Sequence, residues 1–255
     1  MNKIMLLVSL FLLQGCALNS NIDNELKDKL LSGMVLVKGG SFEMGGTCVE
    51  QPKCVHPRRT VTLDDFYIGK FEVTQGLFDS VLGSSNSYFQ GENYPVNNLS
   101  WQQAKYFITK LNLKTGLEFR LPTEAEWEFA AKGGIHSENY TYSGSNILED
   151  VGWFVKNSNN QAHPVGLKQA NELGIYDMTG NVGEMTEDAY DAEYYQYGPK
   201  LNPVNALDSK HHLAYKSVRG GSFAYDSNES ENFRRDSASQ SAVMPDIGLR
   251  LVLSK

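Results

Sequence analysis

The second half of the chain, from Gly134 onward, has no helical periodicity. Short aromatic and polar stretches alternate there with Gly, Asn and Pro. Apolar residues at every third or fourth position mark the core face of a helix, and this pattern is missing. The 255 residues include 23 Gly, 13 Tyr and 12 Phe, which favours many turns and aromatic packing over a helical bundle. We therefore expect one domain with two helices and much loop.

Two helices with capping boxes are expected in the first half. Ser100 with Gln103, and Thr123 with Glu126, have the spacing of an N-cap residue and the residue that completes the box. The first of these helices carries its apolar residues on one face and ends at Gly116. A shorter helix is expected over 74–82. The expected strands are 34–37, 41–44, 60–63, 66–71, 216–223 and 248–253, the first two forming a β-hairpin.

Charge and hydropathy exclude two classes of protein. The formal net charge is −7 and no Lys/Arg cluster stands out, so a nucleic-acid-binding surface has no electrostatic basis. No stretch reaches the roughly 20 apolar residues that a membrane-spanning helix needs. A 41% apolar composition is enough for a substantial core. We therefore expect a folded protein that binds no nucleic acid and does not span a membrane.

The N-terminus has the layout of a bacterial lipoprotein signal. Residues 1–15 hold a lysine and a short apolar run, and the segment from Leu13 to Cys16 resembles a lipobox. We expect cleavage before Cys16, acyl chains on Cys16 that insert into the bilayer, and a polar tether over residues 16–33 with room for a short helix. Ala17 favours the outer membrane of the envelope and leaves open which face carries the protein. The alternative is an ordinary cleaved signal with a chance cysteine.

Cys48 and Cys54 are the other two cysteines, and they flank Pro52. In an exported protein, two cysteines this close favour a disulfide that closes the local loop. The alternative is a metal site, for which His56 is the one further ligand close in sequence. We expect the disulfide.

Seven sequence segments follow one another between residues 34 and 253. They are MVLVKGGSFEMG at 34–45, FYIGKFEVT at 66–74, YPVNNLSW at 94–101, RLPTEAEWE at 120–128, GIYDMTGNVGE at 174–184, RGGSF at 219–223 and GLR at 248–250. Together they resemble the formylglycine-generating enzyme (sulfatase-modifying factor) family. The resemblance implies a domain over residues 34–255 with the family's variant of the C-type-lectin-like fold, which is α+β and rich in ordered loops.

The family's oxidases bind copper through two cysteines in the loop after the Arg-Gly-Gly-Ser motif. The resemblance places these two positions at Tyr225 and Ser230. A phenol and an alcohol cannot replace the soft thiolates that suit Cu(I). We therefore expect no copper and no formylglycine-generating oxidase activity.

The resemblance also implies a calcium site in the 177–184 segment. Asp177 and Glu184 would supply carboxylate oxygens, and Gly180 and Val182 would supply carbonyl oxygens, which are the hard donors that Ca²⁺ takes. The alternative is a network of Asx turns around Asp177 and Asn181 without a metal.

The segment from Ala224 to Val243 is polar and mixed, a composition that suits recognition surfaces. The candidate ligand- or partner-binding residues are Tyr225, Asp226, Asn228, Asn232 and Arg234. We expect a membrane-anchored, non-catalytic binding or assembly module whose partner is an envelope protein or a surface ligand not identified by the sequence. Two alternatives stay open: the segment is an ordinary solvated loop, or the protein is a metal- or cofactor-dependent enzyme of the family with chemistry that needs no cysteines.

Overall fold

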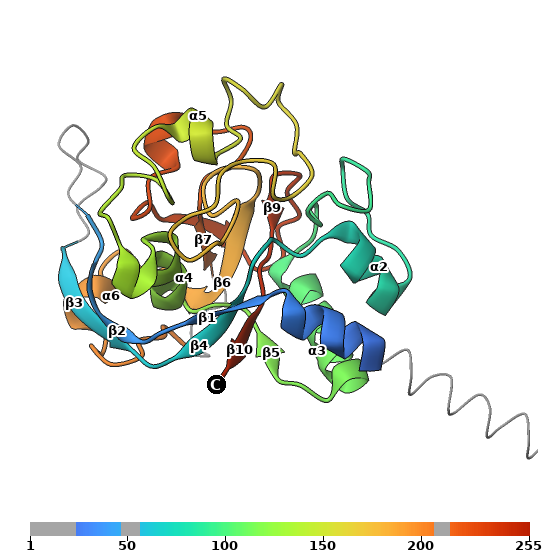
Figure 1. Cartoon of the computed structure of the whole chain (residues 1–255), viewed down its shortest axis with the longest axis horizontal. Helices are drawn as coiled ribbons and strands as arrows, with labels where there is room; N and C mark the ends of the chain where they lie inside the picture. The colour runs from blue at the N-terminus through green and yellow to red at the C-terminus, as the bar shows by residue number, and fades with distance from the viewer. Residues whose placement is uncertain (1–23, 47–56, 207–214) are drawn as a thin grey trace, which may run out of the picture.

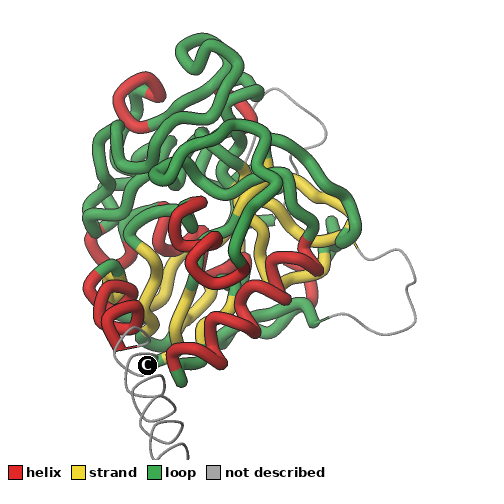
Figure 2. The backbone as a smooth tube through the Cα atoms, turned by 90° about the vertical axis from the view of Figure 1, so that its right-hand side faces the viewer, coloured by secondary structure: helices red, strands yellow, loops and turns green. Residues whose placement is uncertain are grey.

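The computed structural model describes residues 24–46, 57–206 and 215–255. Cys16, Cys48 and Cys54 lie outside these residues, so lipidation and the disulfide stay predictions. The described chain is α+β and loop-rich, as expected: short strands and helices lie in the lower part of Figure 2, and loops fill the upper part.

Residues 34–44 run antiparallel to residues 59–69 as one bent ribbon (Figure 1). At one end β1 (Met34–Val37) pairs with β4 (Phe66–Gly69), and at the other β2 (Gly40–Met44) pairs with β3 (Arg59–Leu63). The expected hairpin between 34–37 and 41–44 is therefore wrong. The glycine between the strands marks the bend instead: a Cβ on Gly39 would lie 2.3 Å from the carbonyl oxygen of Leu63.

The other strands complete two four-stranded sheets. In the first, β10 (Val252–Ser254) lies between β4 and β5 (Phe119–Arg120), so the order is β1-β4-β10-β5. The second has the order β8-β7-β6-β9, formed by β6 (Gly183–Ala189), β7 (Tyr215–Arg219), β8 (Asp236–Ser239) and β9 (Ile247–Gly248). Its β6 and β9 are parallel, whereas its other pairs are antiparallel.

Both predicted capping boxes are present. Ser100 caps α3 (Trp101–Thr115), which ends at Gly116 in the left-handed conformation. Thr123 caps α4 (Glu124–Ala131). The predicted short helix is α2 (Gln75–Leu82), capped by Thr74. The remaining named helices are short: α5 (Leu148–Val151), α6 (Tyr194–Tyr197) and the 3₁₀ turns η1 (Gly134–His136) and η2 (Ser227–Glu229).

The core has two main apolar clusters. One joins α2, α3 and the adjoining strands through Phe78, Phe107 and Leu111, and the other surrounds Trp127 of α4. Residues 24–32 form a helix whose Leu30 is buried in the first cluster, so the part of the predicted tether after residue 23 packs on the fold. Among the described residues, no helix is long and apolar enough to cross a membrane.

Candidate functional site

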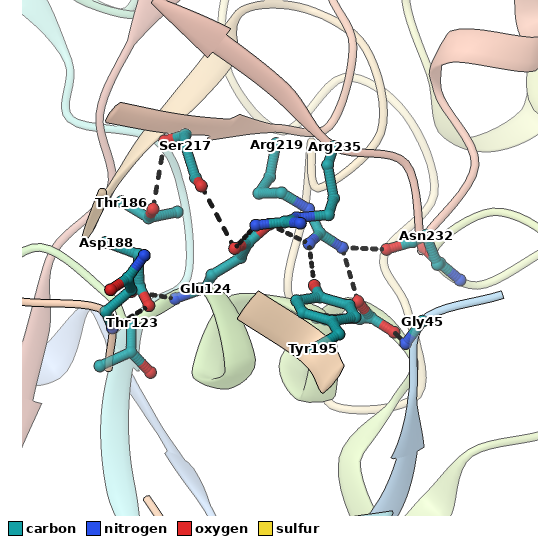
Figure 3. A network of polar contacts seen from close by, with 12 residues as sticks. Gly45, Thr123, Glu124, Thr186, Asp188, Tyr195, Ser217, Arg219, Asn232 and Arg235 are labelled. Atoms are coloured by element: carbon teal, nitrogen blue, oxygen red, sulfur yellow. Dashed lines mark hydrogen bonds and ion pairs between the residues drawn. The ribbon is translucent and has the colours of Figure 1, made fainter. Parts of the chain in front are cut away.

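Helix α4 is buried along its whole length, although three of its eight residues are glutamates. Figure 3 shows the surroundings of one of them, Glu124. Arg219 donates to Glu124 at 2.9 Å and to Glu128 at 2.8 Å, and Arg235 donates to Glu124 at 2.6 Å. These pairs join α4 to β7 and to the segment of residues 224–243, called the C-terminal loop below. They therefore connect segments that lie about 100 positions apart in sequence.

The charges of this network shift the acidity of its members. Burial raises the pKa of Glu124, but the positive charges of Arg235 and Arg219 outweigh burial and lower the pKa to about 2. Asp188 accepts the backbone N–H of Glu124, and burial raises the pKa of Asp188 to about 7. Glu124 is therefore held as a carboxylate, whereas its neighbour Asp188 resists ionisation.

The same network fixes part of the C-terminal loop. The carbonyl of Asn232 accepts from Arg219 at 2.8 Å, and the Asn232 side chain donates to the Tyr140 carbonyl at 3.1 Å. Asn232 is only 2% exposed. These two bonds hold the loop in place at Asn232.

The two positions of the family's copper ligands carry hydroxyl groups with local partners. Ser230 is buried, and its backbone N–H donates to Ser227. The carbonyl of Tyr225 accepts from Val155, and burial together with the negative charges of Asp236 and Asp246 raises the pKa of the Tyr225 phenol. Neither side chain supplies a thiolate, and the phenol stays protonated at neutral pH.

A cavity of about 730 Å³ lies between β2, α4, η1 and the C-terminal loop. Three of the five predicted binding residues line it: Asn228, Asn232 and Arg234. Tyr225 and Asp226 are not among its lining residues. The structure thus brings three of the five residues to one cavity, and their role in binding stays a prediction.

Sequence reasoning missed the apolar wall of this cavity. Phe42 of β2 and Phe129 of α4 pack with ring centroids 5.0 Å apart, and Ile135 of η1 is 55% exposed beside them. Lys132 lies near the Phe42 ring and pairs with Glu128 at 2.6 Å, while Arg58 lies on the rim. No single segment carries these residues, so no sequence motif could have marked the wall.

The expected calcium donors are arranged differently from a cation site. Glu184 accepts three hydrogen bonds from Arg250 and one, at 2.8 Å, from the indole N–H of Trp127. Asp177 has a positive φ of 57° and accepts from Gly166 at 2.7 Å, which leaves its other oxygen without a partner. No three acidic, His or Cys side chains come together for a metal anywhere in the described chain.

Glu72 is the buried acid that sequence reasoning overlooked in this region. Its carboxylate accepts from the Asn181 amide at 2.7 Å and from the Val182 backbone at 3.1 Å. Burial, and then the charges of Asp177 and Glu184, raise its pKa well above the ordinary value. As arranged, the Asn181 turn is held by Glu72, and the charge of Glu184 is balanced by Arg250. The Glu184 carboxylate is therefore engaged by protein donors, Asp177 keeps one oxygen without a partner, and calcium binding stays a prediction.

Comparison with known proteins identifies the family of the chain. The chaperone protein LppX of Paenibacillus barcinonensis is 32% identical over 272 aligned residues, which cover 87% of this chain and 89% of LppX. Two solved structures cover 87% of the chain: PvdO from Pseudomonas aeruginosa, at 27% identity and a TM-score of 0.74, and Treponema denticola variable protein 1, at 26% and 0.73. The aligned regions cover 94% of the PvdO chain and 95% of the Treponema chain. The model of the sulfatase-modifying factor enzyme 1-like domain matches residues 22–255. The chain therefore belongs to the formylglycine-generating enzyme (sulfatase-modifying factor) family, and the α+β, C-type-lectin-like fold expected from its motifs is confirmed.

Proposed function

We propose that this protein is a non-catalytic, lipid-anchored binding module of the bacterial envelope that holds a client polypeptide in the cavity. The observation that carries the proposal is the placement of the 730 Å³ cavity. The predicted recognition loop supplies one wall of it, whereas the two positions of the family's copper ligands carry Tyr225 and Ser230.

The chemistry of the lining suits a polypeptide. Phe42 and Ile135, backed by the buried Phe129, offer an apolar wall for a client side chain, and Asn228 and Arg234 offer polar contacts for its backbone and charged groups. The family relative LppX is named a chaperone, which supports a client that is a protein in the course of folding or assembly.

Client holding is tested by light scattering from an unfolding model protein such as reduced lysozyme. We expect the wild-type protein to suppress aggregation and Ile135→Asp to remove most of this effect, because it places a charge on the apolar wall. Leu167→Asp is the matched control, since Leu167 is 60% exposed and lies outside the cavity. Equal suppression by both variants would contradict the proposal.

The expected absence of formylglycine-generating activity is tested separately. Incubation of the purified protein with Cu(I), oxygen and a cysteine-containing sulfatase peptide should give no formylglycine, because thiolates are absent from the two ligand positions. Formation of formylglycine by the wild-type protein would instead establish the enzyme alternative.

The anchor is tested by cell fractionation. Cys16→Ser should release the protein from the membrane fraction or leave it unprocessed, since the thiol is the expected site of acylation. Mass spectrometry of the mature protein that shows an unmodified Cys16 would contradict lipidation.

A further inference from the structure

One face of helix α3 is exposed and has no partner in the described chain. Tyr106 is 56% exposed and Leu113 is 76% exposed. Seven residues are almost two complete helical turns, so both side chains lie on the same outer face. Lys110 lies within this face, with its ammonium group 5.2 Å from the centre of the Tyr106 ring.

The charge of α3 differs from that of the chain as a whole. The protein has a net charge of −7, yet the 15 residues of α3 include three lysines and no acidic residue. Lys105 is neutralised by Glu187 at 2.6 Å. Lys110 and Lys114 form no ion pair with a described residue: the Lys110 ammonium lies over the Tyr106 ring, and the Lys114 ammonium donates to the Ser80 carbonyl at 3.2 Å. Neither positive charge is therefore balanced by a carboxylate, and Lys114 is exposed.

The position of α3 relates it to the anchored end of the chain. The helix of residues 24–32, drawn in blue in Figure 1, packs into the same apolar cluster as α2 and α3. With Cys16 acylated as proposed, residues 17–23 connect the bilayer to this helix, and an extended segment of that length reaches roughly 25 Å. The elements that line the cavity, β2 and α4, lie on the opposite side in Figure 1.

We infer that the outer face of α3 lies on an anionic phospholipid surface and orients the anchored protein with its cavity directed away from the membrane. Lys110 and Lys114 contact the lipid phosphates, while Tyr106 and Leu113 enter the headgroup region. The orientation rests on the lipid anchor of the proposed function, but the lipid contact itself does not depend on the cavity.

The contact is weak by itself because only two unpaired lysines contribute to it. A lysine near an anionic surface changes the partition coefficient by about fivefold, so the two together account for about 30-fold. The acyl chains would supply the affinity, and α3 would set the orientation.

The test uses the chain of residues 16–255 with Cys16→Ser, which lacks acyl chains but keeps every described residue. Its co-sedimentation with phosphatidylglycerol vesicles is compared with that on phosphatidylcholine vesicles at low salt. We expect a preference for phosphatidylglycerol that falls about 30-fold in Lys110→Gln/Lys114→Gln. Lys156→Gln/Lys200→Gln is the matched control, because both lysines are exposed and lie outside α3.

Three outcomes would overturn the inference: no vesicle binding, equal binding to the two lipids, or equal losses in the two double variants. The substituted lysines are on the surface, and thermal melting of each variant verifies that the fold is intact. The cavity variants of the client assay should bind vesicles like the wild type. A negative result in the client assay therefore does not affect the vesicle result, and a negative vesicle result does not affect the client assay.

Discussion

Two adjacent arginines of the C-terminal loop have different roles. Arg234 lines the cavity, whereas the side chain of Arg235 is fully buried and pairs with Glu124. A buried charge is tolerated only when its partner is present, so the pair of Arg235 with Glu124 contributes to folding, whereas Arg234 lies in the wall of the cavity. Composition alone could not separate these roles, because both residues belong to the same polar segment.

The first prediction concerns the Arg235–Glu124 pair. Arg235→Met should lower the free energy of unfolding by roughly 3–5 kcal/mol, because the carboxylate of Glu124 loses one of its two cationic partners inside the protein. Urea denaturation measures the change. Lys38→Ala, which breaks an exposed pair with Asp65, should leave stability almost unaltered and serves as the control. Similar effects of the two substitutions would contradict the role given to the network.

The second prediction follows from the low pKa of Glu124. Its value is about 2 in the fold against an ordinary 4.5. A carboxyl whose pKa is lowered by folding stabilises the protein above its unfolded pKa and loses this contribution as the pH falls. The free energy of unfolding should therefore fall by roughly 3 kcal/mol through this group between about pH 4.5 and 2. Asp188 has the opposite effect, because folding raises its pKa to about 7. Through this group the free energy of unfolding falls as the pH rises from about 4 to 7.

Urea denaturation at a series of pH values measures this dependence. In Arg235→Met the pKa of Glu124 is lowered less, so the loss of stability below pH 4 should be smaller than in the wild-type protein. A loss of the same size in both proteins would show that Glu124 is not the group responsible.

At the scale of elements, α3 and α4 are stabilised in different ways. Helix α3 buries one face, with Phe107 and Leu111 in the core, whereas α4 buries every residue and satisfies its glutamates through ion pairs. Both begin with a capping box, which satisfies backbone N–H groups that have no partner within the helix. The start of each helix is thus specified by residues within a few positions of it.

The third prediction tests a cap. Ser100→Ala should cost about 1 kcal/mol of unfolding free energy, because the N–H of Gln103 loses its acceptor at the start of α3. Chemical denaturation measures the change. Thr109→Ala on the exposed side of the same helix is the control and should have little effect, since alanine has a higher helix propensity than threonine. A larger loss for Thr109→Ala would contradict the importance of the cap.

For the molecule as a whole, buried polar side chains hold loops where regular structure is scarce. Asn171 donates to the Ala130 carbonyl and accepts from Leu173 and Ile175, while Asn181 accepts from His163 and donates to Glu72. Each of these side chains replaces backbone pairing that a strand or helix would provide. The stability of the loop region therefore depends on complete polar networks more than on secondary structure.

The fourth prediction concerns calcium and the stability of this loop region. An ion that binds only the folded state would stabilise it by roughly 2.7 kcal/mol at 100 times its Kd. If Ca²⁺ binds at Asp177, the melting temperature should be higher in CaCl₂ than in EGTA, and Asp177→Asn should remove the difference. Identical melting curves for the wild-type protein in both solutions would contradict the site and leave Arg250 as the counter-charge of Glu184.

The capped helices, the loop-rich fold class and the family were all accessible from sequence. Capping boxes and helix-ending glycines act over a few residues, so local sequence decides them. Strand pairing was less accessible: residues 34–37 and 41–44 suit a local hairpin, yet each pairs with a partner across the ribbon because the glycine at 39 packs against the β3–β4 turn.

Only the tertiary structure decided which groups meet. Arg219 pairs with Glu124 from 95 positions away, and Arg250 takes the carboxylate of Glu184 that the motif had suggested for calcium. The cavity combines β2, α4, η1 and the C-terminal loop, none of which has a binding motif of its own. These contacts depend on how distant segments pack. The energetic effect of a buried charge, or of an apolar wall, is set by the neighbouring groups that the fold brings to it.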